Sequence, residues 1–152
     1  ARSVTVVVAT GNGGNSDRVA FPACISNAMS VGATYDRTYE GNSPEFGRAC
    51  AMTAASEVDL CADADCVVGK LLKVEKDPTY TYVCSVQVAG LMTLPGGTGA
   101  TLTRGKKIVG DLLVAAKGYI REVDTAVAAE LGKMRGFIID ASDTAAVVVA
   151  LY

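Results

Sequence analysis

The stretch TYTYVCSVQVAG, residues 79–90, decides the fold class of this chain. Every second residue from Tyr80 to Val88 is apolar or aromatic, and the residues between them are mostly polar. Side chains that alternate in this way lie on opposite faces of a β-strand. The stretch therefore predicts a strand with one face toward a core.

Runs of the same kind fill the rest of the chain at short intervals, which is typical of a sandwich or barrel. The sequence predicts a mainly β fold, a compact sandwich or barrel of short antiparallel strands with at most one or two short helices. The closing strand is expected to bury Val148. The one good helix candidate is Thr125 to Met134, with Asp124 or Thr125 as its N-cap. The predicted strands are Val4 to Thr10, Cys24 to Ala33, Arg48 to Thr53, Glu57 to Leu60, Val67 to Lys76, Tyr80 to Ala89, Leu91 to Leu94, Lys107 to Val109, Asp111 to Ala115, Tyr119 to Val123, GFIID (136–140) and AAVVVALY (145–152).

Turn residues separate these strands. Pro95-Gly96-Gly97 and Arg104-Gly105-Lys106 each predict a turn, as does Ala141-Ser142-Asp143. Lys117-Gly118 predicts a two-residue hairpin turn. Near residue 46 the composition changes from Gly-, Asn- and Ser-rich to closely spaced strand-like runs. Residues 1–46 are therefore expected to form an extended segment or arm and 47–152 a barrel-like core, within one structural unit.

Charge and hydropathy exclude several classes of partner. The net charge is −2, and the longest basic cluster is Arg104, Lys106 and Lys107, which is typical of a solvated turn. Nucleic-acid binders carry a clustered positive surface, so no nucleic acid is expected. No apolar run approaches the ~18 residues that span a bilayer, so no membrane partner is expected.

The residues that could carry chemistry are better explained by structural roles. The five cysteines are odd in number and irregularly spaced, which favours buried free thiols over disulfides or zinc. Asp59, Asp63 and Asp65 lack the ligand pattern of a calcium loop and are expected in a solvated turn. Asp124 and Asp143 each precede Thr-Ala, as in aspartic proteases, but turn and cap roles explain both. No metal, cofactor or catalytic residue is predicted.

Two stretches near the start resemble the segment of subtilisin-like proteases that delivers an oxyanion-hole Asn. They are VVVATGNGGNS (6–16) and FPACISNAMSVGATYD (21–36), and the resemblance implies that Asn12 is that Asn. The triad of such enzymes needs a His as general base, and this chain contains no His. It also lacks the Gly-Thr-Ser-Met-Ala-type turn that presents the nucleophile. We therefore expect that the chain is not an enzyme.

Residues 47–152 resemble the capsid decoration, or cement, proteins of tailed bacteriophages. The resemblance rests on Leu94-Pro95, Gly105, Lys117-Gly118, and Gly136 with Val147 to Leu151. It implies a noncatalytic virion protein that forms homotrimers and clamps neighbouring subunits of the major capsid protein. Such a protein is made in the host cytoplasm and lies on the outer capsid surface.

The N-terminal run is the candidate contact with capsid or sister subunits, because an extended segment can add a strand to an exposed sheet edge. An ordinary core strand is the alternative for this run. Two other functions stay open: a protein-binding module related to a subtilisin-like protease fragment, and a host-surface-binding module displayed on a particle. The candidate contact residues are Ser3, Val4, Thr5, Val6, Val7 and Val8.

Overall fold

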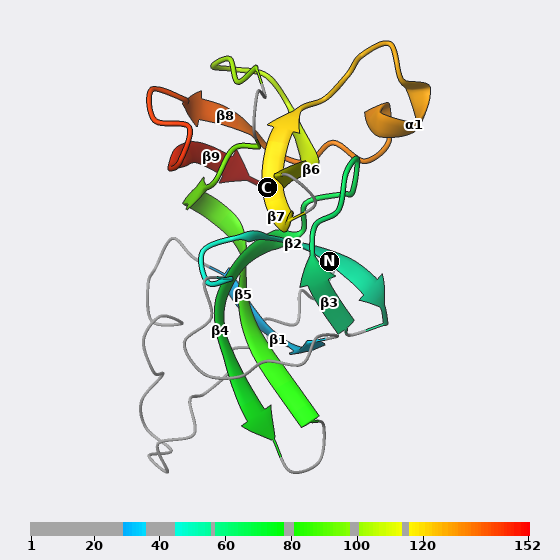
Figure 1. Cartoon of the computed structure of the whole chain (residues 1–152), viewed down its shortest axis with the longest axis vertical. Coiled ribbons are helices and arrows are strands. Elements are labelled where there is room, and N and C mark those ends of the chain that lie inside the picture. Colours follow the sequence, from blue (N-terminus) through cyan, green and yellow to red (C-terminus); the bar gives the residue numbers. More distant parts are fainter. Residues whose placement is uncertain (1–28, 36–44, 56, 78–80, 98–100, 114–115) are drawn as a thin grey trace, which may run out of the picture.

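The computed structural model describes residues 29–35, 45–55, 57–77, 81–97, 101–113 and 116–152. Within them the chain is mainly β, as the sequence predicts, with one short helix (Figure 1). The elements are β1 (Met29–Tyr35), β2 (Ala49–Ala54), β3 (Glu57–Leu60), β4 (Gly69–Asp77), β5 (Thr81–Leu94), β6 (Ile108–Leu113), β7 (Ala116–Glu122), α1 (Ala128–Leu131), β8 (Phe137–Asp140) and β9 (Val147–Leu151).

The main sheet is curled into a partial barrel. Its strand order is β1-β3-β2-β4-β5-β9-β8, and β1 also pairs with β5, so that the first five strands curl back on themselves. The strand pairs are antiparallel as predicted, except that β1 runs parallel to β3. A separate hairpin of β6 and β7 lies beside β8 and β9 (Figure 1).

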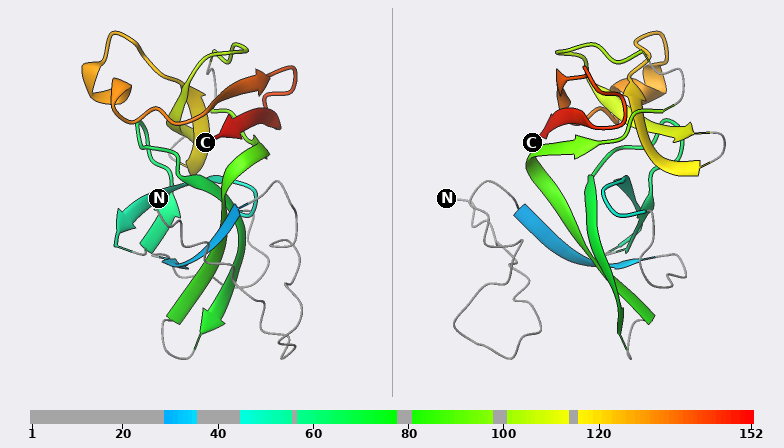
Figure 2. Two further views of the ribbon diagram at one scale, coloured as in Figure 1. Left: turned by 180° about the vertical axis from the view of Figure 1, so that it is seen from behind. Right: turned by 60° about the vertical axis from the view of Figure 1, so that its left-hand side comes forward.

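Strand β5 runs through both halves of the molecule (Figure 2). Its first part pairs with β4 and β1, and its last five residues, from Gly90 to Leu94, pair with β9. The two strands predicted at 80–89 and 91–94 are therefore one strand. Gly90 has a φ of 94°, a conformation that glycine adopts without steric cost, so the strand turns there instead of ending.

Two groups of buried apolar side chains form the core. In the orientation of Figure 1, the lower group lies inside the curl of β1 to β5, and the upper group lies between β5, β9 and the β6–β7 hairpin. Strand β2 serves both, because Cys50 packs into the lower group while Ala49 and Ala51 pack into the upper one. The largest fully buried side chains of the lower group are Leu60 and Leu71, and those of the upper group are Leu94, Ile108, Ile120 and Ile138.

The β6–β7 hairpin differs from the prediction in where it turns. Lys107 to Val109 and Asp111 to Ala115 were expected as two strands, but 108–113 form the single strand β6. Lys117-Gly118 lies inside β7 and makes no turn. Gly118 does have a φ of +91°, so the sequence signal for an unusual backbone was correct while its interpretation as a hairpin turn was wrong.

The predicted helix is reduced to one turn. Residues 128–131 are helical and Gly132 caps their C-terminus, whereas Thr125 to Val127 precede the helix. Val127 occupies the N-cap position without a side-chain hydrogen bond, so the expected cap by Asp124 or Thr125 is not made. No helix in the described ranges is long and apolar enough to cross a bilayer.

Several predictions fall outside the described residues. These are the strand at 4–10, the contact residues 3–8, and Asn12. Of the predicted arm, Met29–Tyr35 forms β1 and pairs with β5 and β3, so this part of the segment belongs to the main sheet. The division at residue 46 otherwise stays a prediction.

The closing strand corrects one core assignment. Val147, Val149 and Leu151 are buried in β9, while Val148 is only half-buried because it lies on the opposite face and pairs with Thr93.

We expect Val149→Asp to destabilise the fold by at least ~3 kcal/mol, since it places an unpaired charge in the upper core. Val148→Asp is the matched control and should cost ~1 kcal/mol. Urea unfolding would measure both, and equal losses would contradict the observed facing of β9.

Candidate functional site

A pocket lies where the lower and upper parts of the molecule meet. Its cavity volume is about 340 Å³. We call it the cationic pocket, because two of its lining side chains are basic and none is acidic. Its lining residues are Phe46, Gly47, Arg48, Lys70, Thr93, Leu94, Pro95, Tyr119 and Ala145.

Arg48 is fixed by contacts from three directions. Its carbonyl accepts a hydrogen bond from the amide of Leu71 at 2.9 Å, which ties it to β4. Its Nη1 donates to the carbonyl of Lys117 at 3.2 Å. The guanidinium carbon lies 5.1 Å from the ring centroid of Tyr119, within the range of a cation–π contact. The guanidinium is thus held in place by neutral groups.

Gly118 provides the space for Arg48. A Cβ at this position would lie 2.7 Å from the Cβ of Arg48, closer than real Cβ atoms approach, and 3.3 Å from Cδ2 of Leu60, which is a tight contact. Its positive φ would strain any other residue as well. The glycine that the sequence assigned to a turn therefore lets β7 approach the Arg48 side of the pocket.

Lys70 provides the second cation. It lies near the start of β4, half-buried, and its Nζ donates to Oγ1 of Thr93 at 2.9 Å. Burial lowers the pKa of its amine, because desolvation disfavours the charged form. None of the ion pairs between described residues includes Lys70 or Arg48.

Two positive groups in one pocket, neither in an ion pair with another described residue, can bind an anion. Guanidinium and carboxylate groups form hydrogen bonds that are about twice as strong as neutral ones. The arrangement offers binding groups, and no lining side chain is a carboxylate, thiol or imidazole that could serve as a general base.

Of the three acidic residues expected in a solvated turn, Asp63 is exposed in a turn as predicted, Asp65 is half-buried, and Asp59 in β3 corrects the prediction. Asp59 is buried, and its Oδ2 accepts from Nζ of Lys117 at 2.7 Å. Asp63 accepts from Arg121, and Asp65 accepts from the amide of Ala62. Because the three carboxylates face different partners, they do not converge on one ion.

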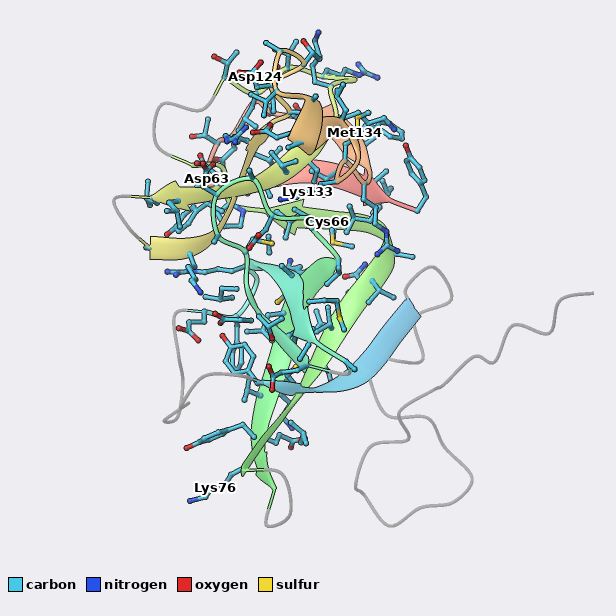
Figure 3. All side chains as sticks on the ribbon, turned by 90° about the vertical axis from the view of Figure 1, so that its right-hand side faces the viewer. Asp63, Cys66, Lys76, Asp124, Lys133 and Met134 are labelled. Carbon is cyan, nitrogen blue, oxygen red and sulfur yellow. The ribbon has the colours of Figure 1, made fainter. Side chains whose placement is uncertain are left out.

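Arg121 also joins Glu130, and this pair holds the loop around α1. Two hydrogen bonds of 2.9 and 2.6 Å link the guanidinium to the carboxylate of Glu130, which is buried. The amide of Asp124 donates to the same carboxylate at 2.9 Å. Lys133 donates to the carbonyl of Ala64 at 3.1 Å, which ties the loop after α1 to the turn that contains Asp63; Lys133 and Asp63 are labelled in Figure 3.

The cysteine prediction is confirmed for the described residues. Cys50, Cys61 and Cys84 are buried, Cys66 is half-buried, and all four are free thiols. Burial raises the pKa of Cys50 and of Cys61, so both stay protonated and unreactive at neutral pH. Cys24 lies outside the described residues.

Asp143 has the turn role that the sequence predicts, and Asp124, for which a helix cap was predicted, has a turn role instead. Oδ1 of each accepts a hydrogen bond from the amide two residues later, in Ala126 and Ala145 respectively. This local bond is the Asx turn. In the described part of the chain, no group of three or more His, Cys, Asp or Glu residues could hold a metal ion.

Comparison with known families assigns the chain. The model of the subtilase family (Peptidase_S8) matches residues 1–100 of the 152. The chain therefore belongs to the subtilase family. The matched range contains both stretches, 6–16 and 21–36, that resemble subtilisin-like proteases. The comparisons give no support for a capsid decoration family, and no curated protein matches the sequence.

The sequence did not single out Arg48, Lys70 or Tyr119. They are 71 positions apart at most, between 48 and 119, and each belongs to a different strand or strand entrance. The only available signal was Gly118, because an unusual glycine inside a run of strand residues often marks a close approach of another segment.

We expect Gly118→Ala to destabilise the protein by ~2 kcal/mol, through its positive φ and its contact with Arg48. Gly105→Ala is the control, since Gly105 also has a positive φ, of +83°, but nothing lies within 4 Å of its Cβ position. Thermal unfolding of both would separate backbone strain from crowding. Equal losses would show that crowding at Arg48 contributes nothing.

Stability should depend on acid through Glu130. Hydrogen bonds from Arg121 lower the pKa of this carboxyl from 4.5 to about 2. The folded state therefore binds the proton less readily than the unfolded state, so the stabilisation is complete above pH 4.5 and is lost as the pH falls from 4.5 toward 2.

Glu130→Gln should cost roughly 2 kcal/mol at neutral pH by removing the charge-assisted bonds. It should also flatten the fall in unfolding free energy below pH 4.5. Urea unfolding at several pH values measures both effects. Glu75→Gln offers a control at an exposed carboxylate, paired with Lys73 on the surface. An unchanged acid slope in Glu130→Gln would contradict the role of the pair of Arg121 and Glu130.

Proposed function

We propose that this chain is a noncatalytic binding module of the subtilase family, which captures an acidic segment of another polypeptide in the cationic pocket. The observation that carries the proposal is that Arg48 and Lys70 line the same pocket. No ion pair between described residues neutralises either of them. An acidic side chain or chain terminus supplies the missing negative charge.

Catalysis by the family's triad does not fit the residues of this chain. The sequence contains no His, so no imidazole can take the proton of a serine nucleophile. The buried cysteines do not replace it, because the raised pKa of Cys50 and Cys61 keeps them as thiols. Binding is the function that remains for the cationic pocket.

The size and rim of the pocket suit a segment of polypeptide. A volume of about 340 Å³ lies at the small end of ligand sites, enough for an acidic side chain and its neighbours. Phe46, which is 38% exposed, offers an apolar surface beside the cations. Two charge-assisted contacts of ~2 kcal/mol each sum to ~4 kcal/mol, and the cost of association reduces this, so we expect weak binding with a Kd of about 1 mM or above.

The capsid-clamping role remains a more specific prediction. Its partner, the major capsid protein, its trimeric state and its place on the outer surface of a virion rest on the sequence resemblance. An acidic loop on a shell subunit would be one polypeptide of the required chemistry. A module displayed on a particle to bind a host surface is a further prediction of the same rank.

Fluorescence anisotropy of a labelled peptide tests the proposal. We expect a Gly-Glu-Glu-Gly peptide to bind more tightly than Gly-Gln-Gln-Gly, with the difference decreasing as salt is raised. Arg48→Gln should weaken binding by about tenfold, a loss of ~1.4 kcal/mol, because it removes one charge-assisted contact. Lys76→Met removes an exposed charge on the same strand as Lys70 and should leave binding unchanged.

Equal binding of both peptides, or equal losses in Arg48→Gln and Lys76→Met, would overturn the assignment of the pocket. A fluorophosphonate probe and a labelled casein test the other half of the proposal. Labelling of any serine, or turnover of casein that survives purification to homogeneity, would show that the chain is catalytic.

A further inference from the structure

We propose that Lys70 is a covalent capture site for small carbonyl compounds that carry a carboxylate. The amine of Lys70 forms an imine with the aldehyde or ketone carbon, while Arg48 holds the carboxylate of the same molecule. This inference goes beyond the proposed binding of polypeptides, since it requires the pocket but no peptide.

Lys70 is distinguished from the other six lysines of the chain by its surroundings. It lines the cationic pocket, whereas Lys73 pairs with Glu75 and Lys117 pairs with Asp59. Lys76 is exposed near the far end of β4, away from the upper part of the molecule (Figure 3). The remaining lysines, Lys106, Lys107 and Lys133, lie outside the lining of the pocket.

The environment favours the form of the amine that reacts. Only the neutral amine is a nucleophile, and a carboxylate partner would stabilise the ammonium form instead. Lys70 has no such ion pair among the described residues, and it shares its pocket with the guanidinium of Arg48. Its burial lowers the pKa of the amine, which also favours the neutral form. Desolvation of a lysine is a known way to activate this nucleophile.

The reaction balances without an oxidant or a cofactor. The lone pair of Nζ attacks the carbonyl carbon, the C=O π electrons move to oxygen, and a proton passes from nitrogen to that oxygen to give a carbinolamine. The C–O bond then breaks, and the hydroxyl leaves with a proton as one molecule of water, so that a C=N bond remains. Oγ1 of Thr93, 2.9 Å from Nζ, is placed to pass the proton.

Arg48 would supply selectivity for the carboxylate. Its guanidinium presents a fork of donors that matches two carboxylate oxygens. Contacts to Tyr119 and to the carbonyl of Lys117 already fix its position, so little additional order is lost on binding. A carbonyl compound that lacks a carboxylate forfeits this contact and should react no faster at Lys70 than at an exposed lysine of equal pKa.

The test uses the full chain with glyoxylate and cyanoborohydride, which reduces the imine to a stable secondary amine. Peptide mass mapping then measures the labelled fraction of each lysine at neutral pH. We expect Lys70 to be labelled severalfold faster than Lys76. Glycolaldehyde, which has an aldehyde and the same carbon count but no carboxylate, should show a much smaller preference for Lys70.

Two variants identify the groups. Arg48→Gln should remove the preference for glyoxylate over glycolaldehyde at Lys70, with circular dichroism confirming the fold. Lys70→Arg should abolish labelling at position 70 yet retain binding of the acidic peptide, which separates this inference from the proposed function. Equal labelling of Lys70 and Lys76 by glyoxylate, or an unchanged preference in Arg48→Gln, would overturn the proposal.

Discussion

Strand β5 is the element on which both halves of this molecule depend. Its first part completes the curled sheet of β1 to β4, and its last five residues pair with β9 in the upper part. The turn at Gly90 changes the direction of the strand without breaking it. Side chains of β5 consequently enter both cores, with Cys84 and Val86 in the lower one and Met92 and Leu94 in the upper one.

The cationic pocket is a consequence of this arrangement. Lys70 comes from β4, beside the lower part of β5, and Thr93 comes from β5 after its turn. Arg48 precedes β2, which contributes to both cores, and Tyr119 comes from the hairpin that packs above. A pocket at such a junction can hold charged groups at the boundary of two apolar cores. Half-burial there leaves the cations accessible to a ligand while partly removing their water.

Membership of the subtilase family raises the question of what the chain retains from it. The family model covers residues 1–100, and the five curled strands, together with the last part of β5, fall within that range. Tyr119 and Gly118, which complete the Arg48 side of the pocket, lie after it. The proposed binding site is therefore formed jointly by residues of the family segment and by the hairpin that follows. Anion binding at this site needs no His, unlike the serine chemistry of the family's triad.

The fold class and most strands could be predicted from the sequence, because period-two alternation and turn residues are local signals. The alternation at 79–90 places Cys84 and Val86 in the core, and the Asx turns at Asp124 and Asp143 are set within three residues. The tertiary structure decided what local signals do not encode: the continuity of β5, the parallel pairing of β1 with β3, and the position of Gly118 against Arg48. The pocket belongs to this second group, since Arg48, Lys70 and Tyr119 become neighbours only when pairing and packing join distant segments.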